Sequence, residues 1–275
     1  MPFGRLRIVT RIITIANQKG GVGKTTTAIN LAASIALAGH TTLLVDCDPQ
    51  ANASSGLGCK GLRATAGTIY DALLSDLGDH PDLETSEQFV LSTSIDRLSL
   101  VPATRDLSGA EIELISVPGR ERRLERFLEP LRSRFDFIII DSPPSLGLLT
   151  LNALVAADRV LIPLHCEYFA LEGLADLVST MRRVRSAFNP SLDIEGVLLT
   201  MNDERTNLGQ QVGKDVREFF KEKVYRTVIP RNVRLAEAPS HGLPAVTYDA
   251  RSRGAEAYFA FANELLARNT ETVKS

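Results

Sequence analysis

The sequence predicts an α/β protein with a doubly wound, mostly parallel sheet that is flanked by helices. Short apolar runs without alternation recur along the chain, and longer runs of helical composition separate them. This pattern is typical of parallel strands that are covered on both faces. In addition, a glycine-rich turn at residues 17–26 lies between the first such strand and the first helix. Elements in that order form a phosphate-binding loop.

The predicted strands are short and rich in Ile, Leu and Val. They cover residues 12–16, 41–46, 135–141, 159–163, 194–201 and 226–230. The predicted helices cover residues 28–38, 68–74, 120–134, 171–188 and 254–268. Residues 59–99 contain Gly, Asp and Ser clusters and predict one helix with surface loops. We expect right-handed crossovers between the parallel strands.

The glycine-rich turn is predicted to bind the phosphates of a nucleotide. Its glycines let backbone N–H groups point at phosphate oxygens, and the helix that follows adds partial positive charge. Lys24 can reach the β- and γ-phosphates, and the Thr25 hydroxyl can bind Mg²⁺. The usual motif would have Gly at position 18, where this chain has Gln18 followed by a second lysine, Lys19. The alternative is a turn with two solvated lysines. The candidate nucleotide-binding residues of the loop are Lys19, Gly20, Gly21, Val22, Gly23, Lys24, Thr25 and Thr26.

Three acidic residues stand at the carboxyl ends of predicted strands, where ligands of parallel sheets bind. Asp46 and Asp48 close the second strand, and Asp141 follows four apolar residues. A carboxylate in the position of Asp141 can hold Mg²⁺ through a water, because this ion keeps much of its hydration shell. The alternative for Asp141 is to cap the next turn. Asp46 either lies one water away from Mg²⁺ or makes hydrogen bonds at the strand end.

The loop with its second lysine, Lys19, resembles a motif of a known family. Residues 19–25, Lys-Gly-Gly-Val-Gly-Lys-Thr, resemble the deviant Walker A motif of ParA/MinD-type ATPases, which are P-loop NTPases. Residues 17–30 and 45–50 look like the chromosomal ParA (Soj-like) partitioning branch. The resemblance runs from Ile12 to Leu266 and is weakest between Cys59 and Ser99.

The resemblance implies an ATPase that uses ATP and Mg²⁺ and forms a homodimer around two nucleotides. Lys19 would reach across to the partner's phosphates, as an arginine finger does in trans. Gly20 would leave room where the two subunits meet. Asp48 matches the family's aspartate beside the γ-phosphate and would orient the attacking water. The candidate catalytic residues are thus Lys19, Lys24 and Asp48, and the candidate metal ligands are Thr25, Asp48 and Asp141.

The base of the nucleotide is expected near the ends of the later strands. Residues 230–234 resemble the family's base-binding segment, which makes Pro230 and Asn232 candidates for packing and hydrogen bonding to adenine. Met201 would pack on the face of the ring. A turn-capping role is the alternative for Asn232. Residues 145–154 and 167–174 resemble the family's second switch and a dimer-interface segment.

The basic residues are unevenly distributed. The formal net charge is −2, yet residues 205–253 contain ten Lys or Arg against five Asp or Glu. Such a cluster hints at an anionic partner, and a solvated helical face is the alternative. Family members bind DNA without sequence preference as ATP-bound dimers, with a ParB-type partner. Arg205 and Arg234 match basic positions used for this, with intramolecular ion pairs as the alternative. Lys214, Arg217 and Arg251 could extend the patch.

Size and composition limit the remaining possibilities. We predict a short N-terminal extension at residues 1–11, a single ATPase domain at 12–268 and a tail at 269–275. No apolar run approaches the ~20 residues that span a bilayer, and the first ten residues lack a secretory apolar region. We therefore expect a cytoplasmic protein, and the resemblance to DNA-binding family members implies that it is nucleoid-associated. The three cysteines, Cys47, Cys59 and Cys166, show no paired spacing and predict reduced, buried thiols.

The sequence favours an ATP-driven switch for chromosome or plasmid partitioning. The main alternative is a MinD-like membrane-surface ATPase for division-site placement, which would need a basic amphipathic C-terminal helix that residues 269–275 do not provide. An iron–sulfur protein of the nitrogenase-iron-protein or Mrp kind would need paired cysteines. An amidoligase on the same fold would need an additional substrate domain, which we do not expect a chain of this length to supply.

Overall fold

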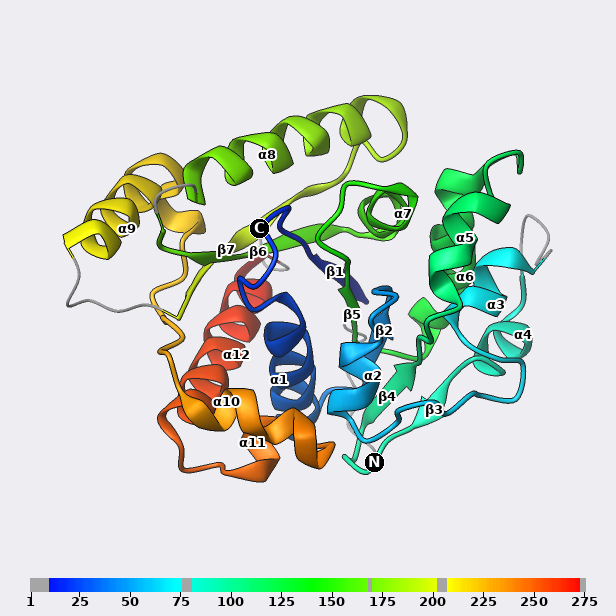
Figure 1. The fold of residues 1–275 in the computed structure, drawn as a ribbon, viewed down its shortest axis with the longest axis horizontal. Helices are drawn as coiled ribbons and strands as arrows, with labels where there is room; N and C mark the ends of the chain where they lie inside the picture. Colours follow the sequence, from blue (N-terminus) through cyan, green and yellow to red (C-terminus); the bar gives the residue numbers. More distant parts are fainter. Residues whose placement is uncertain (1–9, 76–80, 168–169, 202–206, 273–275) are drawn as a thin grey trace, which may run out of the picture.

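Figure 1 shows the protein, a computed structural model, as a central sheet with helices on both sides. The structure describes residues 10–75, 81–167, 170–201 and 207–272. The sheet has seven strands in the order β3-β4-β2-β5-β1-β6-β7. β3 pairs antiparallel with β4, and every other pair of neighbours in the described sheet is parallel. The strands are β1 Arg11–Ile15, β2 Thr42–Asp46, β3 Leu91–Ser92, β4 Leu98–Val101, β5 Phe137–Asp141, β6 Arg159–His165 and β7 Asp193–Thr200.

Most of the helices connect one strand to the next. The α-helices are α1 Lys24–Leu37, α2 Asn52–Gly56, α3 Ile69–Leu74, α4 Leu83–Glu87, α5 Leu107–Glu113, α6 Arg123–Leu128, α7 Leu148–Ala156, α8 Ala170–Ala187, α9 Asn207–Phe220, α10 Val233–Glu237, α11 Ala245–Tyr248 and α12 Arg253–Thr272. Short 3₁₀ turns lie at Arg120–Arg122, Pro130–Ser133, Lys221–Lys223 and Ala238–His241. None of the described helices is long and apolar enough to cross a membrane.

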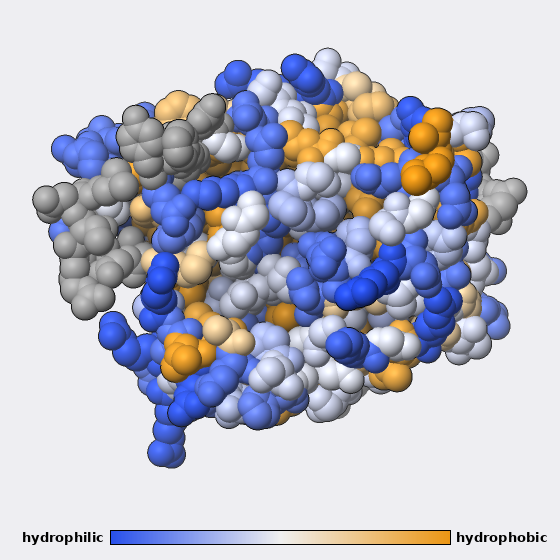
Figure 2. All heavy atoms as spheres, viewed as in Figure 1, coloured by the Kyte–Doolittle hydropathy of each residue, from blue (hydrophilic) through white to orange (hydrophobic). Residues whose placement is uncertain are grey.

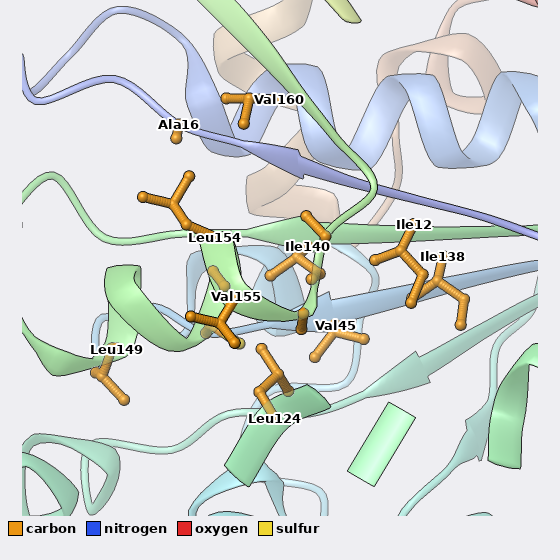
Figure 3. Close-up of a cluster of buried hydrophobic side chains, with 14 of the residues drawn as sticks. Ile12, Ala16, Val45, Leu124, Ile138, Ile140, Leu149, Leu154, Val155 and Val160 are labelled. Atoms are coloured by element: carbon orange, nitrogen blue, oxygen red, sulfur yellow. The ribbon is translucent and has the colours of Figure 1, made fainter. Parts of the chain in front are cut away.

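The sheet has an apolar core on each face. Successive residues of a strand point to opposite faces, so Ile12 and Ile138 enter one core while Ile13 and Ile139 enter the other. Helices α3 and α5 to α9 cover the first core, and α1, α11 and α12 cover the second. Figure 3 shows Ile12 and Ile138 gathered with Leu154 of α7 in the first core. Burial on both faces explains why the central strands read as continuous apolar runs.

The structure confirms the predicted fold class and most predicted elements. The strands at 12–16, 41–46, 135–141, 159–163 and 194–201 are present as β1, β2, β5, β6 and β7, within two residues at each end. The helices at 68–74, 171–188 and 254–268 correspond to α3, α8 and α12. α1 begins at Lys24, earlier than the predicted start at residue 28, because the glycine-rich turn leads directly into the helix.

Two predicted elements are wrong in detail. The helix at 120–134 is a 3₁₀ turn, then α6, then a second 3₁₀ turn that begins at Pro130. Proline lacks the N–H that would continue the α-helix. The strand at 226–230 does not form, because the N–H groups of Arg226 and Thr227 both donate to the Glu264 carboxylate at 2.9 Å instead of to a neighbouring strand. Isolated bridge residues remain on either side of this stretch, at Val224, which pairs with Val197, and at Pro230.

The region at 59–99 contains more than the one predicted helix. α4, β3 and the first residues of β4 also lie there, and β4 pairs with β2 over four residues. Its sequence, Leu-Ser-Leu-Val, is short and is interrupted by a serine. Such a run is too short for hydrophobic periodicity to identify as a strand.

Candidate nucleotide-binding site

Three strand ends meet at the carboxyl edge of the sheet. β5 lies between β1 and β2, and Asp141 at its end is level with Ile15 on one side and Asp46 on the other. The glycine-rich loop follows β1, and the chain that carries Asp48 follows β2. The fold therefore brings the predicted phosphate loop and all three acidic residues to one place.

The glycine-rich loop needs glycine at two positions. Gly21 has φ 73° and Gly23 has φ 86°, a left-handed conformation that other residues adopt at a cost of about 1–2 kcal/mol. Gly23 is also the N-cap of α1. A Cβ atom on Gly20 would meet no atom within 4 Å. A hydrogen bond joins the loop to β7, because the Thr200 hydroxyl donates to the carbonyl oxygen of Val22 at 2.8 Å.

The two lysines of the loop have different surroundings. Lys24 is 7% exposed, and its ammonium donates to the carbonyl oxygen of Lys19 at 3.1 Å. Burial lowers the pKa of Lys24, against the opposing negative charges of Asp141 and Asp48. The Lys19 side chain is 33% exposed and its ammonium forms an ion pair with Glu167, which follows β6. One lysine therefore faces inward to the loop, and the other lies at its rim.

The Asp46 side chain accepts hydrogen bonds from residues that follow its own strand. One carboxylate oxygen accepts hydrogen bonds from the N–H and the hydroxyl of Ser54, at 2.8 and 2.7 Å. The other accepts from the N–H of Asp48 at 3.2 Å. Burial raises the pKa of Asp46 to about 6, although the Ser54 donors oppose this. The Ser54 hydroxyl also accepts from the N–H of Ala103 at 2.9 Å. The geometry therefore favours the strand-end role for Asp46.

Asp141 has surroundings that suit a metal ligand. It is fully buried, and in the described part of the chain neither carboxylate oxygen has a hydrogen-bond partner of normal geometry. Burial and the charge of Asp46 raise its pKa well above the usual range, and Thr25 and Lys24 only partly offset this. A buried carboxylate without donors, beside a threonine hydroxyl, fits a Mg²⁺ ion that keeps waters and phosphate oxygens as its other ligands. The described residues contain no cluster of three or more His, Cys, Asp or Glu side chains that could hold a metal alone.

The predicted base-binding residues lie around the end of β7. Met201 directly follows this strand with φ 49° and is partly buried. A backbone hydrogen bond from Ile229 to Leu199, at 2.9 Å, holds Pro230 beside the same strand end. The Asn232 side chain accepts a hydrogen bond from the backbone N–H two residues later, at 2.9 Å, and caps α10. The capping role considered for Asn232 is therefore present.

The predicted DNA-binding residues are divided among separate elements. Lys214 and Arg217 lie on α9 and line a groove of about 580 Å³ together with Leu199 and Glu218. Both are exposed, and Lys214 is within 3.8 Å of Glu218. Figure 1 shows α9 apart from α10, which carries Arg234.

Arg234 forms the intramolecular ion pairs considered as its alternative. Its guanidinium is 2.7 Å from Glu237 and 3.2 Å from Asp249. Arg251 is exposed in the turn between α11 and α12. Arg205 lies outside the described residues. In Figure 2, hydrophilic side chains cover much of the visible face.

Sequence reasoning assigned no role to several residues that hold the site together. The Asn17 amide donates to the carbonyl oxygen of Pro163 at 2.7 Å and accepts from the N–H of Lys19 at 3.0 Å. Asn17 could have been found from its place beside the loop. Ser54 and Thr200 carry no local signal, because their partners come from other elements. The three cysteines are free and buried, as predicted.

Comparison with known proteins places the chain in a family. The AAA domain family model (AAA_31) matches residues 10–194. Chromosome partitioning protein ParA of Myxococcus xanthus is 56% identical over 262 residues, which is 95% of this chain and 90% of that protein. Sporulation initiation inhibitor protein Soj of Bacillus subtilis is 55% identical, over 94% of this chain and 98% of that protein.

A solved structure with a different name has the same fold. Cobyrinic acid a,c-diamide synthase from Mycobacterium smegmatis, with bound ATP analogue and magnesium, matches with a TM-score of 0.77 and 37% identity, over 94% of this chain and 95% of that one. Chain length therefore does not separate an amidoligase from a partitioning protein. The identity to the ParA and Soj proteins is higher than the identity to this structure. The chain belongs to the ParA/MinD family of deviant Walker A ATPases, in its chromosomal ParA (Soj-like) branch.

Proposed function

We propose that this chain is a Mg²⁺-dependent ATPase that dimerises with bound ATP, binds DNA without sequence preference and drives chromosome or plasmid partitioning. The observation that carries the proposal is the different placement of the two lysines in one loop. Lys24 is buried within the loop, and the ammonium of Lys19 lies at the partly exposed rim. A single subunit needs one lysine for its phosphates, which leaves the other for a second subunit.

ATP hydrolysis would use residues from the three converging strand ends. Lys24 and the N–H groups of the loop bind the phosphates, and Thr25 and Asp141 hold Mg²⁺, with Asp48 as a further candidate. Bound Mg²⁺ would neutralise charge that develops on the phosphate oxygens. Asp48 orients the attacking water, and the hydrogen bond from its N–H to Asp46 fixes the backbone that carries it. Catalysis of this kind depends mainly on positioning and electrostatics.

Dimerisation would bring the rims of two such loops together. Lys19 contacts the phosphates bound by the partner subunit, so that ATP joins the two subunits and hydrolysis releases them. The open space around Gly20 supports a close approach at this point. The names of the 56% and 55% identical relatives, a partitioning protein and Soj, support the same class of function.

DNA binding would follow from dimerisation, which doubles the number of exposed cations. Lys214, Arg217 and Arg251 are exposed in the described structure, and Arg234 could exchange its acidic partners for phosphates. Contacts of this kind give affinity without base readout. We place the protein in the cytoplasm on the nucleoid, with a ParB-type protein as its stimulating partner and no membrane attachment.

Sedimentation velocity tests the proposal directly. The wild-type protein is measured with Mg²⁺ and a non-hydrolysable ATP analogue, with ADP, and without nucleotide. We expect a dimer only with the analogue, and co-sedimentation with a DNA duplex of arbitrary sequence only under the same condition. Lys19→Gln should remain monomeric, whereas Lys60→Gln, a change at an exposed lysine outside the loop, should behave as wild type. A wild-type protein that stays monomeric in all three conditions would contradict the proposal.

A further inference from the structure

The rim lysine of the loop is already paired within its own subunit. The ammonium of Lys19 forms an ion pair with the carboxylate of Glu167, just beyond the carboxyl end of β6. Both side chains are partly exposed, 33% and 47%. A Lys19 that serves the partner's phosphates therefore has to leave Glu167 first.

Glu167 is surrounded by cationic and imidazole groups. Nδ1 of His165 lies 2.8 Å from its second carboxylate oxygen. The hydrogen bond from Lys19 lowers the pKa of Glu167 most, with smaller contributions from the charges of His165, Lys19 and Arg231. Glu167 is thus a carboxylate at neutral pH and a stable acceptor for the lysine.

The backbone of Lys19 is fixed independently of this ion pair. Its N–H donates to the Asn17 side chain, and Asn17 in turn donates to the carbonyl oxygen of Pro163 on β6. Asn17 is 4% exposed, so this connection is shielded from water. The ammonium can therefore change partner by rotation of the flexible lysine side chain alone.

We propose that Glu167 is a positioning residue that holds Lys19 in its own subunit and thereby sets the protein concentration at which ATP-dependent dimers form. The proposal rests on the trans role of Lys19 proposed above. Glu167 and the partner's ATP phosphates compete for one ammonium group. The carboxylate holds the lysine in the monomer, and the more highly charged phosphates take it only when a second, ATP-loaded subunit is present.

The test is the dimer dissociation constant of Glu167→Gln, measured by sedimentation with Mg²⁺ and a non-hydrolysable ATP analogue. Partly exposed ion pairs of this kind change an equilibrium by about 1.5- to 5-fold. Two subunits each give up one pair, so we expect the dissociation constant to fall by about 2- to 25-fold. The difference from wild type should shrink at high salt, which screens exposed charges. Glu129→Gln is the matched control, because it removes an exposed ion pair with Arg132 near the amino end of the sheet.

A double-mutant cycle separates positioning from a general structural effect. Lys19→Gln should remain monomeric, and in that background Glu167→Gln should not restore the ATP-dependent dimer. Tighter dimerisation that persists without Lys19 overturns the proposal, as does an unchanged or weaker dimer in the single variant. A weaker dimer would mean that Glu167 contacts the partner instead. If wild type forms no ATP-dependent dimer at all, the proposed function fails; if wild type dimerises and Glu167→Gln does not tighten it, only this inference fails.

Discussion

Ser54→Ala should destabilise the protein and slow hydrolysis together. The Ser54 hydroxyl donates to Asp46 at 2.7 Å and accepts from the N–H of Ala103 at 2.9 Å, and both Ser54 and Asp46 are fully buried. Its removal takes one donor from a buried carboxylate and leaves a buried N–H without a partner. Each loss costs about 1–2 kcal/mol, or about 2–4 kcal/mol together.

Thermal unfolding without nucleotide measures the stability change. For a chain of this size each kcal/mol lowers Tm by about 2–4 °C, so we expect a fall of about 4–16 °C. Phosphate release should also decrease, because Asp46 holds the N–H of Asp48. Ser55→Ala, one residue along α2, is the matched control and should stay near wild type. A Tm within about 2 °C of wild type would refute the assigned hydrogen-bond network, since a loss of at least ~2 kcal/mol is expected.

Three further results are expected. Asp48→Ala should retain ATP binding, measured by equilibrium dialysis, and lose most phosphate release; full turnover would remove Asp48 from the water-orienting role. Asp46, whose pKa is raised from 3.8 to about 6, contributes stability that is fully present below about pH 4 and is lost as pH rises through about 6. The test is chemical denaturation of wild type and Asp46→Asn, in the presence of a chelator and without nucleotide. The unfolding free energy of wild type minus that of Asp46→Asn should fall between about pH 4 and 6 and stay constant at higher pH. A difference that does not change with pH would contradict the effect of burial on the Asp46 pKa. Lys214→Ala should reduce the salt slope of DNA binding by about 1 without changing ATPase activity, and an unaltered slope would exclude Lys214 from phosphate contact.

The elements that were predicted well from the sequence are the strands that are buried on both faces of the sheet. β1, β2 and β5 are buried on both faces, so three or four of the five residues in each are apolar and the run is recognisable without an alignment. The segment at 226–230 contains Val228 and Ile229, but the N–H groups of Arg226 and Thr227 bond to Glu264, which lies far along the chain in α12. Local composition contains no information about such a distant acceptor.

In the candidate site, too, features with a local sequence signal were predicted and contacts between distant residues were not. The loop at 19–26 and Asp141 were predicted because glycine spacing and strand-end position are local features of the sequence. The pairing of Lys19 with Glu167 and the contact of Ser54 with Ala103 join residues far apart in the chain. These depend on which strands become neighbours, and the strand order follows from the tertiary fold rather than from any one segment.

The place of β1 in the sheet has a consequence for synthesis. β1 leaves the ribosome before both of its neighbours, β5, which begins at Phe137, and β6, which begins at Arg159. Until those strands emerge, both edges of β1 lack their native partners and its isoleucines lack their native cover. The nascent chain therefore completes its phosphate loop only after β5 and β6 have been translated, and fragments that end before β5 should be prone to aggregation.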